Sequence, residues 1–160
     1  MLLKKFQLDI SYGQISVFLS SIPQPFNDWT QAHVEQGFAW RLGSVSFATL
    51  IEAGKFTIDV VLTDNAEDYN NEFIRAIEVP FFIPVNEQIE IASIADSLKI
   101  SVPSGKYTLK YELLSQEHAP EGHIRLIFKK SEAMHFSVQR EDKRLISQEN
   151  LLLTANPAAS

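Results

Sequence analysis

Apolar and polar residues alternate along much of the chain, which is the period of a β-strand with one face in the core. Residues 6–10, Phe-Gln-Leu-Asp-Ile, show this clearly, and a turn at 12–14 leads into a second strand at 15–19. The same reasoning predicts strands at residues 45–50, 56–62, 73–82, 88–91, 98–102, 107–114, 123–128 and 135–138. Turn-forming residues separate many of these segments. Numerous short strands in one chain favour a sandwich or barrel over a parallel α/β sheet.

One helix interrupts the alternation, near residues 29–36. Asp28 is a suitable N-cap for it, with Gln31 three residues later completing a capping box. Gly37 is well placed to end the helix in the left-handed conformation. We therefore predict an all-β fold, an antiparallel β-sandwich with one short helix.

The last twenty residues differ in character from the rest of the chain. Residues 140–144 are five consecutive charges, and the final seven residues are small and polar. We therefore predict a sandwich domain at 1–139 and a C-terminal tail at 140–160. The leucines at 151–153 could dock this tail on the domain as a helix or an added strand. A weakly ordered tail is the interpretation that its composition favours.

Composition excludes several classes of function. The chain has 160 residues and a net charge of -6, so its overall field does not favour direct binding to nucleic acid or to an anionic membrane. It contains no cysteine, which excludes disulfides, thiolate metal sites and a cysteine nucleophile. No apolar run has the length of a signal peptide or of a membrane span. We expect a cytoplasmic protein, and association with a membrane-bound partner stays open.

The negative charge is concentrated in one part of the sequence. Residues 52–96 carry ten acidic and two basic side chains, whereas the segments on either side are nearly balanced. Within this part, the acidic stretch (residues 64–72) combines four carboxylates with one tyrosine: Asp64, Glu67, Asp68, Tyr69 and Glu72. It could present negative charge to a basic protein partner, with the tyrosine as an anchor. The alternative is a solvated connection that keeps the domain soluble.

Signals for catalysis are weak. The four histidines, at 33, 118, 123 and 135, match no zinc signature, so we predict no metal site. Neither a nucleophile elbow nor a phosphate-binding loop is present, and no cofactor is expected. Trp29 and Trp40 flank the predicted helix and are interpreted as core or interface anchors.

Several short motifs in a fixed order indicate a family. Between residues 27 and 47 they are Asn-Asp-Trp-Thr (27–30), Val-Glu-Gln-Gly-Phe-Ala (34–39) and Gly-Ser-Val-Ser-Phe (43–47). Glu-Val-Pro-Phe (78–81), Ile-Glu-Ile-Ala-Ser-Ile (89–94) and Val-Pro-Ser-Gly-Lys-Tyr (102–107) follow. This succession resembles the competence protein J family over residues 5–114. The match fades within the acidic stretch, and residues 140–160 extend beyond the family's usual end.

The resemblance implies a non-catalytic protein that binds and silences a nuclease during DNA uptake. Combined with the acidic stretch, it predicts a nuclease with a basic groove as the partner. The alternative is a sandwich that binds a small ligand such as a carbohydrate, or one that hydrolyses a substrate through paired carboxylates. The residues leave open whether an inhibitor of this kind blocks the groove or holds the nuclease in an inactive shape.

Overall fold

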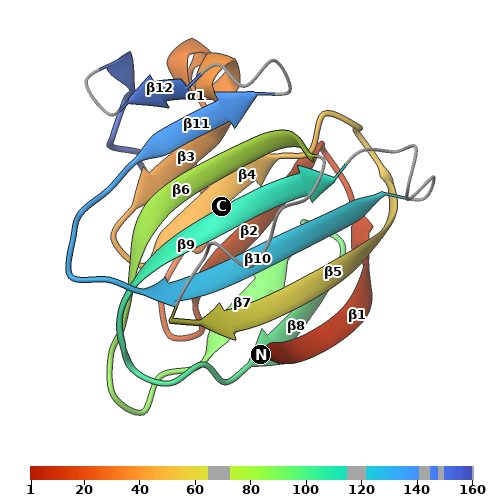
Figure 1. Cartoon of the computed structure of the whole chain (residues 1–160). Helices are drawn as coiled ribbons and strands as arrows, with labels where there is room; N and C mark the ends of the chain where they lie inside the picture. The colour runs from red at the N-terminus through yellow and green to blue at the C-terminus, as the bar shows by residue number, and fades with distance from the viewer. Residues whose placement is uncertain (65–72, 115–121, 141–144, 148–149, 160) are drawn as a thin grey trace.

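The structure is a computed structural model that describes residues 1–64, 73–114, 122–140, 145–147 and 150–159. Within these residues, twelve strands form two facing sheets, and the helix α1 (Gln31–Gln36) lies beside one edge of the smaller sheet (Figure 1). The larger sheet has the order β1 (Leu2–Ile10), β5 (Gly54–Thr63), β10 (His123–Lys130), β9 (Gly105–Leu114), β6 (Phe73–Ile83), β11 (Ser137–Arg140) and β12 (Leu145–Ser147). The smaller sheet has the order β3 (Phe38–Arg41), β4 (Ser44–Ala48), β2 (Gln14–Leu19), β7 (Ile89–Ala92) and β8 (Ser97–Ile100).

This arrangement confirms the predicted all-β sandwich with one short helix. One pair of strands departs from a purely antiparallel sheet, because β5 and β10 run parallel. The other pairings between described strands are antiparallel. The parallel pair arises because β10 enters the sheet between β5 and β9, and its direction is already fixed by its hairpin with β9.

The core lies between the two sheets and is built from the alternate residues that point inward. Phe47 on β4 and Tyr111 on β9 stack with their ring centroids 4.6 Å apart, which joins the two layers directly. The Tyr111 hydroxyl donates a hydrogen bond to the carbonyl oxygen of Ala48 at 2.9 Å. Burial raises the pKa of Tyr111 far above its ordinary value of 10.0, so this phenol stays protonated in the folded protein.

The helix begins later than the sequence predicts. Thr30, not Asp28, is the N-cap, and its hydroxyl accepts a hydrogen bond from the His33 backbone N–H. The backbone N–H of Thr30 in turn donates to His33 Nδ1 at 3.0 Å, so the histidine takes the place that Gln31 was expected to fill. Gly37 ends the helix at a φ of 91°, as predicted.

The described part of the C-terminal segment is docked on the domain. β12 pairs with β11, residues 152 and 154 contact α1, and residues 156–158 lie against residues 26–28. The Gln36 side chain donates to the carbonyl oxygen of Leu152 and accepts from its N–H, at 2.9 and 2.8 Å. His33 Nε2 donates to the carbonyl oxygen of Thr154 at 2.7 Å. The buried polar side chains of His33 and Gln36 thus provide hydrogen-bonding partners for the backbone of this segment.

A row of alternating charges crosses the face of the larger sheet that points away from the core. Lys5, Asp59, Arg125 and Glu112 are successive neighbours across β1, β5, β10 and β9. Glu112 is fully buried and lies 3.4 Å from both Arg125 Nη1 and Lys110 Nζ. These ion pairs balance the charges of the buried carboxylates on this face.

Candidate functional site

Of the acidic stretch, the structure describes only the first residue, Asp64. Asp64 is exposed and directly follows β5, whereas Glu67, Asp68, Tyr69 and Glu72 lie outside the described residues.

Strand register shows where the acidic stretch leaves the sheet. Thr63, the last residue of β5, is in line with Lys129, Thr108 and Pro80 on the next three strands of the sheet. The stretch therefore begins at the same end of the sandwich as Pro80. Burial, and then the negative charge of Asp64, raise the pKa of Tyr107 at this end.

Other carboxylates of residues 52–96 are engaged within the fold. Asp59 accepts a hydrogen bond from His123 Nε2 at 2.7 Å and lies 3.6 Å from Lys5 Nζ. Glu78 lies 3.5 Å from His135 Nε2, and Asp96 accepts hydrogen bonds from backbone N–H groups. Several carboxylates of residues 52–96 are therefore paired or hydrogen-bonded within the fold, and only the remaining ones can offer their charge to a partner.

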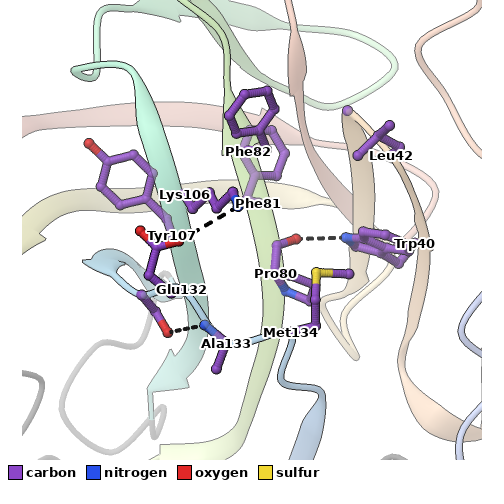
Figure 2. Close-up of a pocket in the computed structure, with 12 residues that line it drawn as sticks. Trp40, Leu42, Pro80, Phe81, Phe82, Lys106, Tyr107, Glu132, Ala133 and Met134 are labelled. Atoms are coloured by element: carbon purple, nitrogen blue, oxygen red, sulfur yellow. Dashed lines mark hydrogen bonds and ion pairs between the residues drawn. The ribbon is translucent and has the colours of Figure 1, made fainter.

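An apolar pocket opens at the end of the sandwich where Asp64 lies, and we call it the β3–β6 pocket (Figure 2). Its volume is about 230 Å³, which exceeds the ~150 Å³ of a cavity known to accept benzene. The pocket is lined by residues of both sheets and of the β10–β11 connection: Trp40, Leu42, Gly43, Pro80, Phe81, Phe82, Lys106, Tyr107, Ser131, Glu132, Ala133 and Met134.

The pocket exists because β11 covers only part of β6. β11 pairs with residues 75–78 of β6, and none of the strands that the structure describes pairs with the following residues of β6 on that side. Pro80, which has no N–H to donate, lies where this uncovered part begins. Its carbonyl oxygen accepts a 2.8 Å hydrogen bond from Trp40 Nε1 of β3, which links the two sheets across the pocket (Figure 2).

Other polar groups of the pocket also have partners within the protein. The Tyr107 hydroxyl donates to the carbonyl oxygen of Pro103 at 2.6 Å, and the Ala133 N–H donates to Ser131 Oγ at 3.2 Å. Lys106 Nζ lies 3.6 Å from Glu132 Oε2 (Figure 2). The pocket therefore presents mainly apolar surface to a binding partner, rather than hydrogen-bonding groups.

The rim of the pocket consists of large apolar side chains that remain in water. Leu42, Met134 and Phe82 expose 73%, 64% and 45% of their surface. Leu42 comes from the turn between β3 and β4, on the Trp40 side of the pocket, and Phe82 from β6. Several large apolar side chains around one hollow are typical of a protein-binding surface.

No group of three or more histidine, aspartate or glutamate side chains is close enough to hold a metal ion in the part of the chain that the structure describes. His33, His123 and His135 contact Thr154, Asp59 and Glu78, respectively. In the same residues, no helix has the length and apolar character needed to cross a membrane.

Comparison with known protein families settles the relationship suggested by the motifs. The profile of competence protein J (ComJ) matches residues 7–139. The chain belongs to this family. The resemblance inferred over residues 5–114 is confirmed, and the match to the ComJ family continues through β10 and into β11.

Two relatives show how close the similarity is. The DNA-entry nuclease inhibitor of Bacillus subtilis (strain 168) is 32% identical over 107 residues, which are 66% of this chain and 78% of that protein. In structure, the chain is similar to ComJ, inhibitor of the DNA degrading activity of NucA, from Bacillus subtilis, with a TM-score of 0.72 and 28% identity. That match covers 82% of this chain and 98% of ComJ. Both relatives are described as inhibitors, in agreement with the prediction of a non-catalytic protein.

A third protein shares the fold of the ComJ family. The solved structure of crocagin biosynthetic gene J matches with a TM-score of 0.52 and 19% identity, over 77% of this chain and 94% of that chain. At this identity the likeness concerns the arrangement of the strands and not the function.

The sequence did not reveal the β3–β6 pocket. Its lining residues come from segments that are far apart in the chain, and Pro80, Phe81 and Phe82 read simply as part of a strand. Trp40 was interpreted as a core or interface anchor, and it forms one wall of the pocket. The sequence feature that could have indicated the pocket is a proline followed by two aromatic residues near the end of a predicted strand, at residues 80–82.

Proposed function

We propose that this chain is an inhibitor that binds a DNA-degrading nuclease and blocks its activity. The observation that carries the proposal is membership of the ComJ family, together with 32% identity to a DNA-entry nuclease inhibitor. The β3–β6 pocket supports it, because a mainly apolar hollow suits a protein partner better than a carbohydrate or a hydrolysable substrate.

Charge gives a physical reason for the choice of partner. A protein that handles DNA carries positive surface that neutralises phosphates. This chain has a net charge of -6, so it is attracted to such a surface while DNA is repelled from the complex. The partner is therefore a nuclease with a basic groove, and the inhibitor covers that groove.

The acidic stretch is the part of the chain that meets this groove. Asp64, Glu67, Asp68 and Glu72 supply the negative charge, and Tyr69 supplies an aromatic anchor. Support comes from the exposure of Asp64 and from its place at the same end of the sandwich as the β3–β6 pocket. The partner thus contacts the pocket end of the sandwich at Asp64, and the acidic stretch leads from there to Phe73 of β6 at the opposite end.

Inhibition can be measured directly. The nuclease encoded in the same genome that is most similar to NucA is titrated with this chain at low salt, and the degradation of a fluorescent DNA duplex is followed. We expect activity to fall to baseline near one equivalent of inhibitor. Undiminished activity at a large excess of folded inhibitor would contradict the proposal.

The contribution of the acidic stretch requires a test matched in charge. The double variant Glu67→Lys/Asp68→Lys should slow association with the nuclease at least about fivefold at low salt, because it removes electrostatic steering. The control, Glu35→Lys/Glu52→Lys, changes the net charge equally at two exposed positions elsewhere. Raising the ionic strength should narrow the difference between the two variants. Equal association rates for both at low salt would remove the acidic stretch from the contact surface.

A further inference from the structure

The β3–β6 pocket combines features that select its occupant. The polar groups of Trp40 and Tyr107 bond within the chain, and the rim of Leu42, Phe82 and Met134 is apolar and exposed. A polar group that enters between these side chains would therefore lose water and find few partners, whereas an apolar side chain would bury apolar surface on both sides. The volume of about 230 Å³ is sufficient for one large aliphatic or aromatic side chain.

The shape of the opening favours a side chain over an added strand. The uncovered part of β6 begins at Pro80, which lacks an N–H, and the Pro80 carbonyl oxygen is already occupied by Trp40 Nε1. A partner strand would lack two regular hydrogen bonds at this position. Insertion of one side chain into the pocket requires neither a backbone N–H nor the carbonyl oxygen of Pro80.

Charge distinguishes between the proteins that could supply this side chain. A second copy of this chain also carries a net charge of -6, so two copies repel one another overall. A nuclease with positive surface is attracted to this chain instead. The occupant that fits both the apolar hollow and the acidic chain that carries it is an apolar side chain next to basic residues.

We propose that the β3–β6 pocket is the anchor point for the nuclease and receives one large apolar side chain from beside its DNA-binding groove. This inference rests on the proposed function and adds the location of the main contact to it. The acidic stretch then raises the rate of association, and the pocket lowers the rate at which the complex dissociates.

The test introduces a charge at the rim of the pocket and, as a control, at a similar position elsewhere. Leu42→Glu and Met134→Glu each place a carboxylate at an exposed rim position, and Val34→Glu does the same on α1, where Val34 is 57% exposed. All three variants gain the same negative charge, which by itself would favour a basic partner. Thermal unfolding of each variant verifies that the fold is retained.

We expect Leu42→Glu and Met134→Glu to weaken binding to the NucA-like nuclease of the same genome at least about tenfold, mainly through faster dissociation, and Val34→Glu to bind like the wild type. Full inhibition by both rim variants with unchanged affinity would overturn the pocket as anchor while leaving the proposed function intact. Loss of affinity only in Val34→Glu would overturn it as well. A wild-type chain that does not inhibit would refute the proposed function and this inference with it.

A second measurement needs no substitution. The chain has two methionines, Met1 on the edge of the larger sheet and Met134 at the pocket rim. With ¹³C-methyl methionine, we expect the Met134 signal to shift when a catalytically inactive form of the nuclease binds the chain. Binding that leaves the Met134 signal unmoved would contradict the inference.

Discussion

Tyr111 shows at the scale of one residue how the two sheets are held together. Its ring stacks on Phe47 of the opposite sheet, and its hydroxyl donates to the Ala48 carbonyl oxygen. Alternation predicted that the strand containing Tyr111 would be half buried, but it could not predict which polar group would bond across the core. That depends on the register between two sheets, which is set by contacts far apart in the sequence.

Replacing Tyr111 with phenylalanine should reveal the protonation of the buried phenol. Near pH 8 we expect Tyr111→Phe to lower the unfolding free energy by about 1 kcal/mol, because the Ala48 carbonyl oxygen loses its donor. Above about pH 10 the tyrosine ionises in the unfolded chain but not in the folded one, so the unfolded state binds fewer protons and wild-type stability falls. The phenylalanine variant has no phenol to ionise at this position, so the difference measured by urea unfolding should shrink toward pH ~11. A difference that does not change with pH would contradict the buried, protonated state.

Glu112 offers a second test at the same scale. It is fully buried between Lys110 and Arg125, so Glu112→Ala leaves two largely buried cations without their carboxylate. We expect a loss of about 3 kcal/mol in unfolding free energy. The control is Glu132→Ala, which removes a carboxylate that is 90% exposed in its pair with Lys106. Similar losses for both variants in denaturant unfolding would contradict the structural importance of the buried row of charges.

At the scale of elements, the sequence predicted most strands because their burial alternates. Residues 6–10 and 15–19 lie within β1 and β2, and residues 107–114 lie within β9. The predictions did not include β3, because its four residues are too few for alternation to show and two of them, Phe38 and Ala39, are both buried. They also omitted β12, which follows a run of charges that composition assigned to a tail.

The position of the C-terminal segment depends on α1, and Gln36 is the residue that shows this best. Its amide forms hydrogen bonds with both the carbonyl oxygen and the N–H of Leu152, and also donates to the Phe38 carbonyl oxygen. Gln36→Ala should therefore lower the unfolding free energy by about 2 kcal/mol and speed the hydrogen exchange of the Leu152 amide. Gln31→Ala, at an exposed position on the same helix, is the control. Unaltered exchange at Leu152 in Gln36→Ala would show that the segment is held by other contacts.

At the scale of the whole molecule, the candidate site could be predicted only in part. The acidic stretch is contiguous, so its charge is visible in the sequence, and the structure describes its first residue, Asp64, as exposed. The β3–β6 pocket is assembled from both sheets, and strand pairing alone decides that β11 leaves part of β6 uncovered. Register between distant segments also brings Asp64 and Tyr107 to the same end of the sandwich. No local pattern contains that information.

The central claim is that this chain covers the DNA-binding groove of a nuclease. The most direct measurement is the fluorescence anisotropy of a labelled DNA duplex bound to a catalytically inactive form of the NucA-like nuclease, as the chain is added. If the chain occupies the groove, the anisotropy falls to that of free DNA near one equivalent, because the acidic protein and the phosphates compete for the same positive surface. An anisotropy that stays constant or rises, with the inhibitor bound alongside the DNA, would contradict the account.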